Sequence, residues 1–135
     1  MGAKGLLLCR SELKRGKMLR VVILDDNVPI RELLAEWLSG AGHLVLDPHT
    51  LPMAQSPEID VVLIDLPNLR EGARSAIAPL RLRFARAQRV GLSTHLGESL
   101  PQRSAVARSL GLFAVLAKPC SRTELLGVIR ALDLP

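Results

Sequence analysis

The sequence I-D-V-V-L-I-D-L at residues 59–66 is almost continuously apolar and β-branched, which is typical of a strand buried on both of its faces. It carries Asp65 near its end, and a carboxylate beside so apolar a strand is costly unless something pairs with it. A second run of the same kind, L-R-V-V-I-L at residues 19–24, also breaks at two carboxylates, Asp25 and Asp26. Such strands predict a parallel sheet that helices cover on both faces.

The rest of the chain alternates short apolar runs with helical patterns. Further strands are expected at residues 43–46, 90–94 and 113–117. Helices are expected at residues 29–39, 51–58 (weak), 70–87, 101–110 and 122–132. Pro101 should open the fourth of these helices, and Pro79 should kink or split the third. Strand and helix thus alternate five times, which predicts an α/β fold with a doubly wound five-stranded parallel sheet.

Length and composition limit the classes of function. A chain of 135 residues supports one domain, and its 48% hydrophobic content argues against intrinsic disorder. Aromatic residues make up 2%, too few for the stacking platforms of proteins that bind single-stranded nucleic acid. The apolar run at residues 6–9 is far shorter than the roughly 20 residues of a membrane helix. Since Cys9 and Cys120 show no metal-ligand spacing, a reducing, cytoplasmic location is expected.

The formal charge of +5 is concentrated in two places. Residues 1–18 carry five basic residues against Glu12, and we expect this basic extension to lie outside a domain that spans residues 19–135. The preferred interpretation is that this segment is an upstream extension, a start-site ambiguity or residues foreign to the protein. The alternatives are a functional basic arm and a disordered tail. A second run, residues 70–89, carries six arginines against Glu71. A solvated helix face is the preferred interpretation of this run, ahead of nucleic-acid binding.

Polar residues follow four of the predicted strands, and doubly wound folds bind ligands at such carboxyl ends. They are Asp25, Asp26, Asp65, Thr94 and Lys118. Three carboxylates packed together repel one another unless a cation compensates, and hard oxygen ligands suit Mg²⁺. One carboxylate can then attack a phosphoryl group, whose oxygens the lysine and the hydroxyl bind, to form an acyl phosphate. The plainer alternatives are a helix cap with a first-turn acid at Asp25 and Asp26, a solvated Lys118 and a strand-forming Thr94.

Four short motifs follow one another at the predicted strand ends. They are V-V-I-L-D-D-N at 21–27, V-V-L-I-D-L-P at 61–67, L-S-T at 92–94 and A-K-P at 117–119. Together they resemble the receiver domain of two-component response regulators, of the single-domain, chemotaxis type, over residues 19–135. The resemblance implies a flavodoxin-like sheet with the strand order 2-1-3-4-5.

The resemblance also implies roles for individual residues. Asp65 is expected to be the phosphoacceptor and a metal ligand. Asp26 is expected to bind Mg²⁺ directly and Asp25 through water, with the backbone carbonyl of Pro67 as a further ligand.

Two other residues are expected to contact the phosphoryl group. Thr94 would donate a hydrogen bond to it and shift toward it on activation. Lys118 would pair with its negative charge, and the Lys118–Pro119 peptide bond is often cis in receivers.

The chain departs from the receiver pattern at three places. The loop after Asp65 is short and places the apolar Pro67 two residues beyond the acceptor, which predicts slow hydrolysis of the phosphoryl group. His95 stands where receivers carry a small residue, and it is either a plain surface side chain or a gate or pH sensor. Val115 replaces the aromatic residue expected on the fifth strand, and Phe113, on the same predicted face, is the candidate substitute.

These features predict a protein that accepts a phosphoryl group on Asp65 from a histidine kinase or phosphotransfer protein and signals through altered binding of a downstream protein. It is expected to lack enzymatic turnover and an output domain, to be a monomer or weak dimer, and to have no nucleic-acid or membrane partner. Two alternatives stay open. One is a pseudo-receiver that docks a partner without phosphorylation. The other is a phosphatase of the haloacid dehalogenase type, which needs Asp-x-Asp after its first strand, where this chain has Asp25-Asp26.

Overall fold

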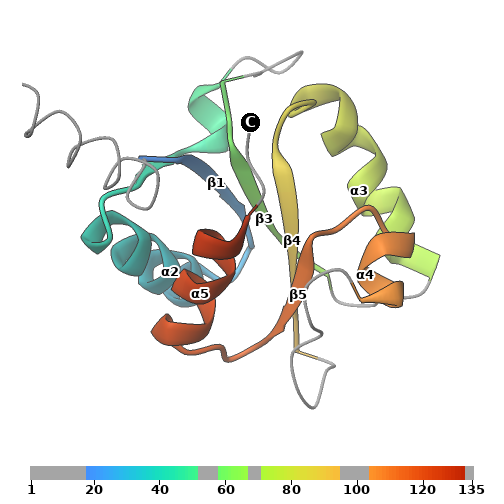
Figure 1. Cartoon of the computed structure of the whole chain (residues 1–135). Helices are drawn as coiled ribbons and strands as arrows, with labels where there is room; N and C mark the ends of the chain where they lie inside the picture. Colours follow the sequence, from blue (N-terminus) through green and yellow to red (C-terminus); the bar gives the residue numbers. More distant parts are fainter. Residues whose placement is uncertain (1–17, 52–57, 67–70, 95–103, 133–135) are drawn as a thin grey trace, which may run out of the picture.

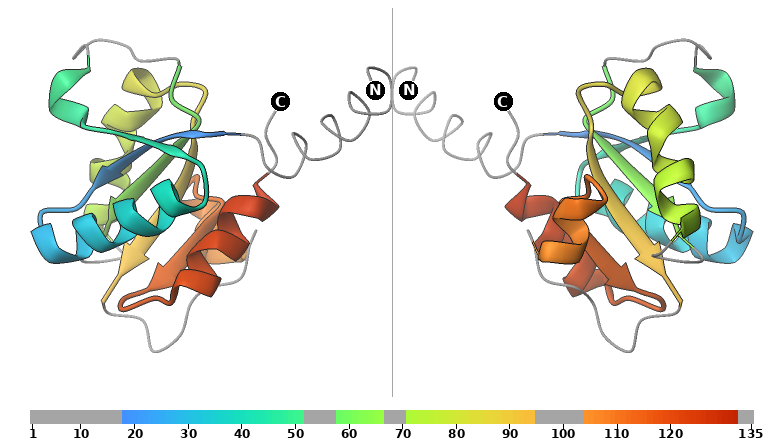
Figure 2. Two further views of the ribbon diagram at one scale, coloured as in Figure 1. Left: turned by 90° about the vertical axis from the view of Figure 1, so that its left-hand side faces the viewer. Right: turned by 90° about the vertical axis from the view of Figure 1, so that its right-hand side faces the viewer.

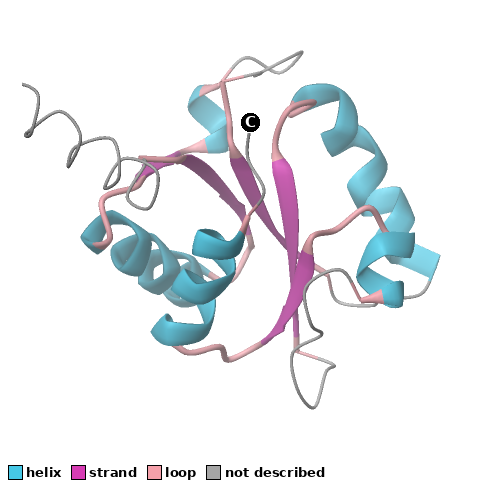
Figure 3. Cartoon of the chain, in the orientation of Figure 1, coloured by secondary structure: helices cyan, strands magenta, loops and turns pink. Residues whose placement is uncertain are grey.

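The computed structural model describes residues 18–51, 58–66, 71–94 and 104–132. Five parallel strands form one sheet (Figure 1, Figure 3): β1 (Arg20–Leu24), β2 (Leu44–Leu46), β3 (Val61–Asp65), β4 (Gln88–Ser93) and β5 (Ala114–Ala117). They lie in the order β2-β1-β3-β4-β5. The predicted doubly wound α/β fold and its strand order are therefore confirmed.

Helices cover both faces of the sheet, as the turned views in Figure 2 show. The helical elements are α2 (Val28–Gly40), a short 3-10 helix η1 (Pro48–Thr50), α3 (Glu71–Arg83), α4 (Ala105–Ser109) and α5 (Arg122–Ala131). On one face, Leu38 of α2 and Leu125 of α5 are buried in one cluster; on the other, Ile77 of α3 and Ala107 of α4 are buried in a second. The core divides in this way because successive strand residues point to opposite faces.

The register of the sheet brings the ends of the strands together. Leu24 of β1 pairs with Ile64 of β3, so Asp25 follows β1 beside the end of β3. Ser93 pairs with Ala117, so β4 and β5 end at the same place. We call this the carboxyl edge of the sheet, and the opposite edge, where the strands begin, the amino edge.

Helix α3 continues through Pro79, whereas the sequence predicted a kink or a break there. Proline removes one backbone hydrogen bond from a helix. Ile77, Leu80 and Phe84 are buried on either side of it and hold both halves of the helix on the sheet. Packing therefore outweighs the lost hydrogen bond.

Helix α4 begins at Ala105, later than predicted. Its N-cap is Ser104, whose side chain accepts a hydrogen bond from the backbone N–H of Ala107, so the prediction that Pro101 opens this helix is wrong. Between β2 and β3 the described residues contain η1, and the weak helix predicted at residues 51–58 falls mostly on residues 52–57, outside the described residues.

Phe113 does not share a face with Val115, contrary to the prediction. Because β5 begins at Ala114, the alternation of the strand does not extend to Phe113. Phe113 packs in the cluster beneath α2 and α5, and Val115 in the cluster beneath α3 and α4. Phe113 therefore cannot take the place of the missing aromatic residue.

Some expectations concern residues outside the described part. The basic extension of residues 1–18 lies almost entirely there, as does Cys9. None of the described helices is long and apolar enough to cross a membrane. Cys120 is a free thiol, as expected, and burial raises its pKa.

Candidate functional site

The turn after β1 places two carboxylates at the carboxyl edge. The N-cap of α2 is Asn27, whose side-chain oxygen accepts a hydrogen bond from the backbone N–H of Ile30 at 3.2 Å. Asp25 precedes this cap, and its Oδ1 accepts a hydrogen bond from the backbone N–H of Asn27 at 2.9 Å. The first turn of α2 contains no acid. The alternative that Asp25 and Asp26 serve as its cap and first-turn acid is therefore wrong.

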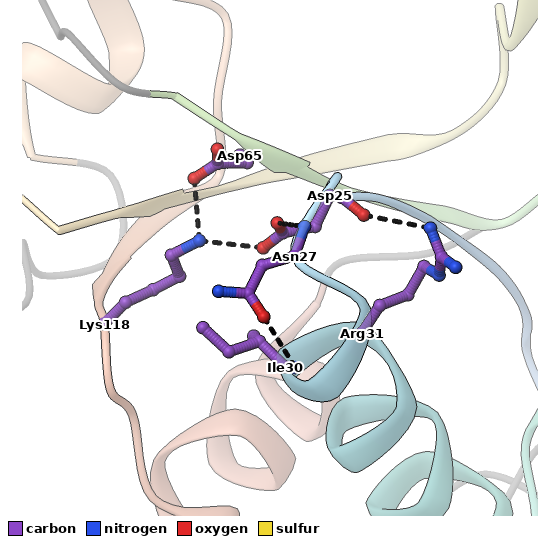
Figure 4. A network of polar contacts seen from close by, with 6 residues as sticks. All are labelled: Asp25, Asn27, Ile30, Arg31, Asp65 and Lys118. Carbon is purple, nitrogen blue, oxygen red and sulfur yellow. Dashed lines mark hydrogen bonds and ion pairs between the residues drawn. The ribbon is translucent and has the colours of Figure 1, made fainter.

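Lys118 joins the ends of β1 and β3 (Figure 4). Its Nζ lies 2.8 Å from Asp25 Oδ2 and 2.9 Å from Asp65 Oδ1. The side chains of Lys118 and Asp25 are 6% and 1% exposed, whereas that of Asp65 is 31% exposed. The backbone N–H of Lys118 donates to the carbonyl of Ser93 at 2.8 Å, which fixes the lysine beside β4. The Lys118–Pro119 peptide bond is cis, as the resemblance implied.

The charges at this edge compensate one another. Burial by itself would lower the pKa of Lys118, but the hydrogen bonds and negative charges of Asp25 and Asp65 outweigh burial and raise that pKa above its usual value. A carboxylate as deeply buried as Asp25 is costly without such a partner. Lys118 thus supplies one positive charge against the carboxylates of this edge, for which the sequence predicted a metal ion as the compensating cation.

A cavity of about 470 Å³ opens beside these residues, a volume within the range of small-molecule sites. Asp25, Asp26 and Asp65 line it, together with Arg31, His49 and Arg83. Nη1 of Arg31 donates to the backbone carbonyl of Asp25 at 3.2 Å. Sequence reasoning missed Arg31. The signal for it is its position one helical turn after the N-cap Asn27, which places it over the end of β1.

The residues predicted to bind Mg²⁺ fit that ion by their chemistry. Asp25, Asp26 and Asp65 offer hard carboxylate oxygens around one cavity. Within the described part of the chain, however, no three His, Cys, Asp or Glu side chains are grouped closely enough to hold a metal ion. Lys118 bridges two of the carboxylates, and Asp26 is exposed. These side chains would therefore have to regroup around an ion. The carbonyl of Pro67 lies outside the described residues.

Thr94 lies on the rim of the site. It is the first residue after β4, it is exposed, and it follows directly on the carbonyl that binds the N–H of Lys118. Of the predicted site residues, the structure brings Asp25, Asp65 and Lys118 into direct contact and places Thr94 beside them. His95, the predicted gate, lies outside the described residues.

Comparison with known sequences finds a distant relative. No family model matches the chain. The CAI-1 autoinducer sensor kinase/phosphatase CqsS of Vibrio cholerae is 26% identical over an alignment of 116 residues that covers 83% of this chain and 17% of the kinase. The chain thus spans less than a fifth of that relative's length.

Solved structures of response regulators have a similar fold. A response regulator of Burkholderia pseudomallei with a phosphorylated aspartic acid, calcium and citrate gives a TM-score of 0.62 at 22% identity, over 84% of this chain and 67% of that one. The chemotaxis protein CheY4 of Vibrio cholerae gives 0.59 at 22% identity, over 84% and 97% of the two chains. A complex of CheX and CheY with beryllofluoride and magnesium, from Borrelia burgdorferi, gives 0.57 at 19% identity, over 82% and 86%. The chain has the fold of the receiver domains of response regulators.

Proposed function

We propose that this chain is a receiver whose Asp65 accepts a phosphoryl group from a phosphohistidine of a histidine kinase or phosphotransfer protein. The observation that carries the proposal is the contact of Lys118 with both Asp25 and Asp65 at the carboxyl edge. Of the two paired carboxylates, Asp65 is the more exposed and is therefore the one that a donor can reach. A response regulator of similar fold carries a phosphorylated aspartic acid, which supports this assignment.

The residues of the carboxyl edge suit each part of the transfer. A carboxylate oxygen of Asp65 attacks phosphorus, so that a P–O bond forms while the P–N bond of the donor breaks and the imidazole nitrogen leaves with its electron pair. Lys118 Nζ, 2.9 Å from Asp65, donates to a phosphoryl oxygen. The hydroxyl of Thr94 donates to another from the rim.

Mg²⁺ would supply further positive charge to the phosphoryl oxygens. Asp25, Asp26 and Asp65 would hold it with the backbone carbonyl of Pro67. Phosphorylation would redistribute the contacts of Lys118, and the loops beyond β3 to β5 would present an altered surface to a downstream protein. The complex of CheX with CheY is an example of such a partner for a neighbour in fold. We propose this role in the cytoplasm, without enzymatic turnover, for a monomer or weak dimer.

The test is phosphorylation of the full chain by a small acyl phosphate in the presence of Mg²⁺. Intact-mass spectrometry is expected to show one added phosphoryl group on the wild type and none on Asp65→Asn. Asp60→Asn is the matched control, because Asp60 lies at the amino edge, where its Oδ2 accepts a hydrogen bond from the backbone N–H of Arg20. The phosphoryl group should persist for hours, because Pro67 cannot orient an attacking water. A phosphorylated Asp65→Asn protein would contradict the proposal.

The second candidate is a pseudo-receiver that docks a partner without phosphorylation. It is favoured by the contact of Lys118 with both Asp25 and Asp65, because the lysine neutralises part of the charge that would otherwise attract a metal ion. Failure of the wild type to bind beryllofluoride with Mg²⁺ would support it. Steady release of phosphate from a phosphomonoester would instead support the haloacid dehalogenase alternative.

A further inference from the structure

The amino edge of the sheet carries positive charge that the proposed function does not use. Helices α3 and α4 cover the same face of the sheet (Figure 1) and end at this edge, next to the beginnings of β4 and β5. We define the arginine face as four arginines and one leucine: Arg81, Leu82, Arg86, Arg89 and Arg108. All of them except Arg89 are exposed.

Arg81 and Arg89 converge on the turn before β5. Nε of Arg89 donates to the carbonyl of Gly111 at 3.2 Å. The guanidinium of Arg81 lies against the same glycine, so closely that a Cβ built there would be 2.5 Å from its Nη2. Burial, and then the positive charge of Arg81, lower the pKa of Arg89, as expected for like charges held close together.

No carboxylate of the described residues forms an ion pair with the arginine face. Asp60, directly before strand β3, accepts a hydrogen bond from the backbone N–H of Arg20 instead. Arg83 differs from the arginines of this face, because it donates to the carbonyl of Pro48 at 2.6 Å and lies over the ring of Phe84, 4.9 Å from the centroid. Arg83 therefore has a structural role, whereas Arg81, Arg86 and Arg89 of the same sequence run form no ion pair with a described carboxylate.

The C-terminal ends of α3 and α4 explain part of the positive charge on the arginine face. Arg81 and Arg108 lie in the last turns of α3 and α4, where positive charge is favourable. The favourable effect of a helix end does not explain why Arg89 lies near Arg81 at the turn around Gly111, or why Leu82 is 75% exposed. A positive surface that no described carboxylate neutralises, with an apolar side chain in it, is complementary to an acidic protein segment that carries an apolar residue. A nucleic-acid backbone would use the charge but not the leucine.

We propose that the arginine face binds an acidic segment of a partner protein, with Arg81, Arg89 and Arg108 pairing with its carboxylates and Leu82 packing against an apolar side chain of the segment. This face lies at the amino edge, at the other end of the strands from Asp65. Binding is therefore independent of the state of Asp65, and the chain stays attached to its partner while the carboxyl edge changes.

The probe is a fluorescent peptide of alternating glutamate and leucine, whose binding to the full chain is followed by anisotropy. Arg81→Glu and Arg108→Glu are each expected to weaken binding about tenfold, and Leu82→Ser about threefold. Arg122→Glu makes the same change of charge on the exposed surface of α5, on the other face of the sheet, and should change binding less than about twofold. Asp65→Asn should bind like the wild type.

Equal weakening by Arg122→Glu would show that net charge alone controls binding and would overturn the proposal, as would a wild type that does not bind the peptide. A DNA duplex that binds more tightly than the peptide, with the same dependence on Arg81, would overturn the choice of a protein partner. The substituted side chains are exposed, and circular dichroism checks that each variant folds. Asp65→Asn separates this proposal from the proposed function, because it abolishes phosphorylation and leaves peptide binding intact.

Discussion

The carboxyl edge and the amino edge of the sheet differ in whether their charged side chains are paired with charges of opposite sign. At the carboxyl edge, Lys118 is paired with Asp25 and Asp65, and the group is largely buried. At the amino edge, Arg81 and Arg89 carry like charges and no described carboxylate pairs with them. The difference follows from desolvation, because a buried charge needs a partner, whereas water screens the exposed Arg81 and the carbonyl of Gly111 accepts a hydrogen bond from the half-buried Arg89. Substitutions of the charged residues should therefore change stability at the carboxyl edge and mainly binding at the amino edge.

The largest effect is expected from Lys118→Met, which keeps most of the length of the side chain and removes its charge. Asp25 is left buried without its cation, so the free energy of unfolding should fall by about 3 kcal/mol at neutral pH, measured by urea denaturation. Mg²⁺ should recover more stability in this variant than in the wild type. Because the pKa of Lys118 is raised in the folded state, its contribution is complete below about pH 10.5 and is lost as the pH rises through the folded value.

Two control variants show whether the loss of stability in Lys118→Met comes from the unpaired charge of Asp25. Adding Asp25→Asn to Lys118→Met should recover about 1 kcal/mol or more, since asparagine keeps an oxygen for the N–H of Asn27. Arg122→Met, which removes an exposed cation from α5, should cost less than about 0.5 kcal/mol. If Lys118→Met costs as little as Arg122→Met, the contrast between the two edges fails.

A smaller effect is expected from Gly111→Ala at the amino edge. Gly111 has a φ of 73°, at which a Cβ is strained by about 1–2 kcal/mol. Gly42→Ala is the control, because Gly42 has a φ of 93° and no atom lies within 4 Å of a Cβ built there. Gly111→Ala and Gly42→Ala should lower the free energy of unfolding by similar amounts, since Arg81 can move at the end of its flexible side chain. Only Gly111→Ala should also weaken binding of the glutamate–leucine peptide. A much larger cost for Gly111→Ala would show that Arg81 is fixed as firmly as Lys118.

The smallest effect is a pH dependence at the amino edge. Nδ1 of His43 accepts a hydrogen bond from the backbone N–H of Leu19 at 3.1 Å, and burial lowers the pKa of His43 below 6.5. Since this pKa is lower in the folded than in the unfolded state, the stabilisation is present above about pH 6.5 and is lost as the pH falls. Urea denaturation from about pH 7.5 to pH 5 should show the wild type losing an advantage of less than about 1 kcal/mol over His43→Asn, because His43 is only partly buried. A difference that does not change with pH would rule out this role of neutral His43.

Much of the fold could be predicted because it depends on local patterns. The apolar runs at residues 19–24 and 59–66 contain β1 and β3, since continuous β-branched residues suit a strand that is buried on both faces. The convergence of Asp25, Asp65 and Lys118 could also be predicted, because parallel strands end at the same edge. The prediction was less accurate for β4, which begins at Gln88, two residues early. Polar residues there join the sheet through backbone hydrogen bonds, which hydropathy does not show.

Other features depend on contacts between distant residues. The division of the core between two faces decided that Phe113 and Val115 belong to different clusters. Burial on both sides of Pro79 decided that α3 is continuous. Neither result is contained in the local sequence, because each depends on which surface the neighbouring elements cover.

The sequence by itself determined which residues reach the carboxyl edge, because an acid or a lysine after an apolar strand lies at the strand's end in any parallel sheet. Only the tertiary structure decided how their charges are balanced. Asp25 and Lys118 are 93 residues apart in the chain, and the register of β1, β3, β4 and β5 places them 2.8 Å apart. The same tertiary arrangement separates Arg83 from Arg81 and Arg89, although all three belong to one basic run in the sequence. The physical reason is that the interaction energy of a charge depends on its distance from other charges and on its burial, and the packing of the chain sets both.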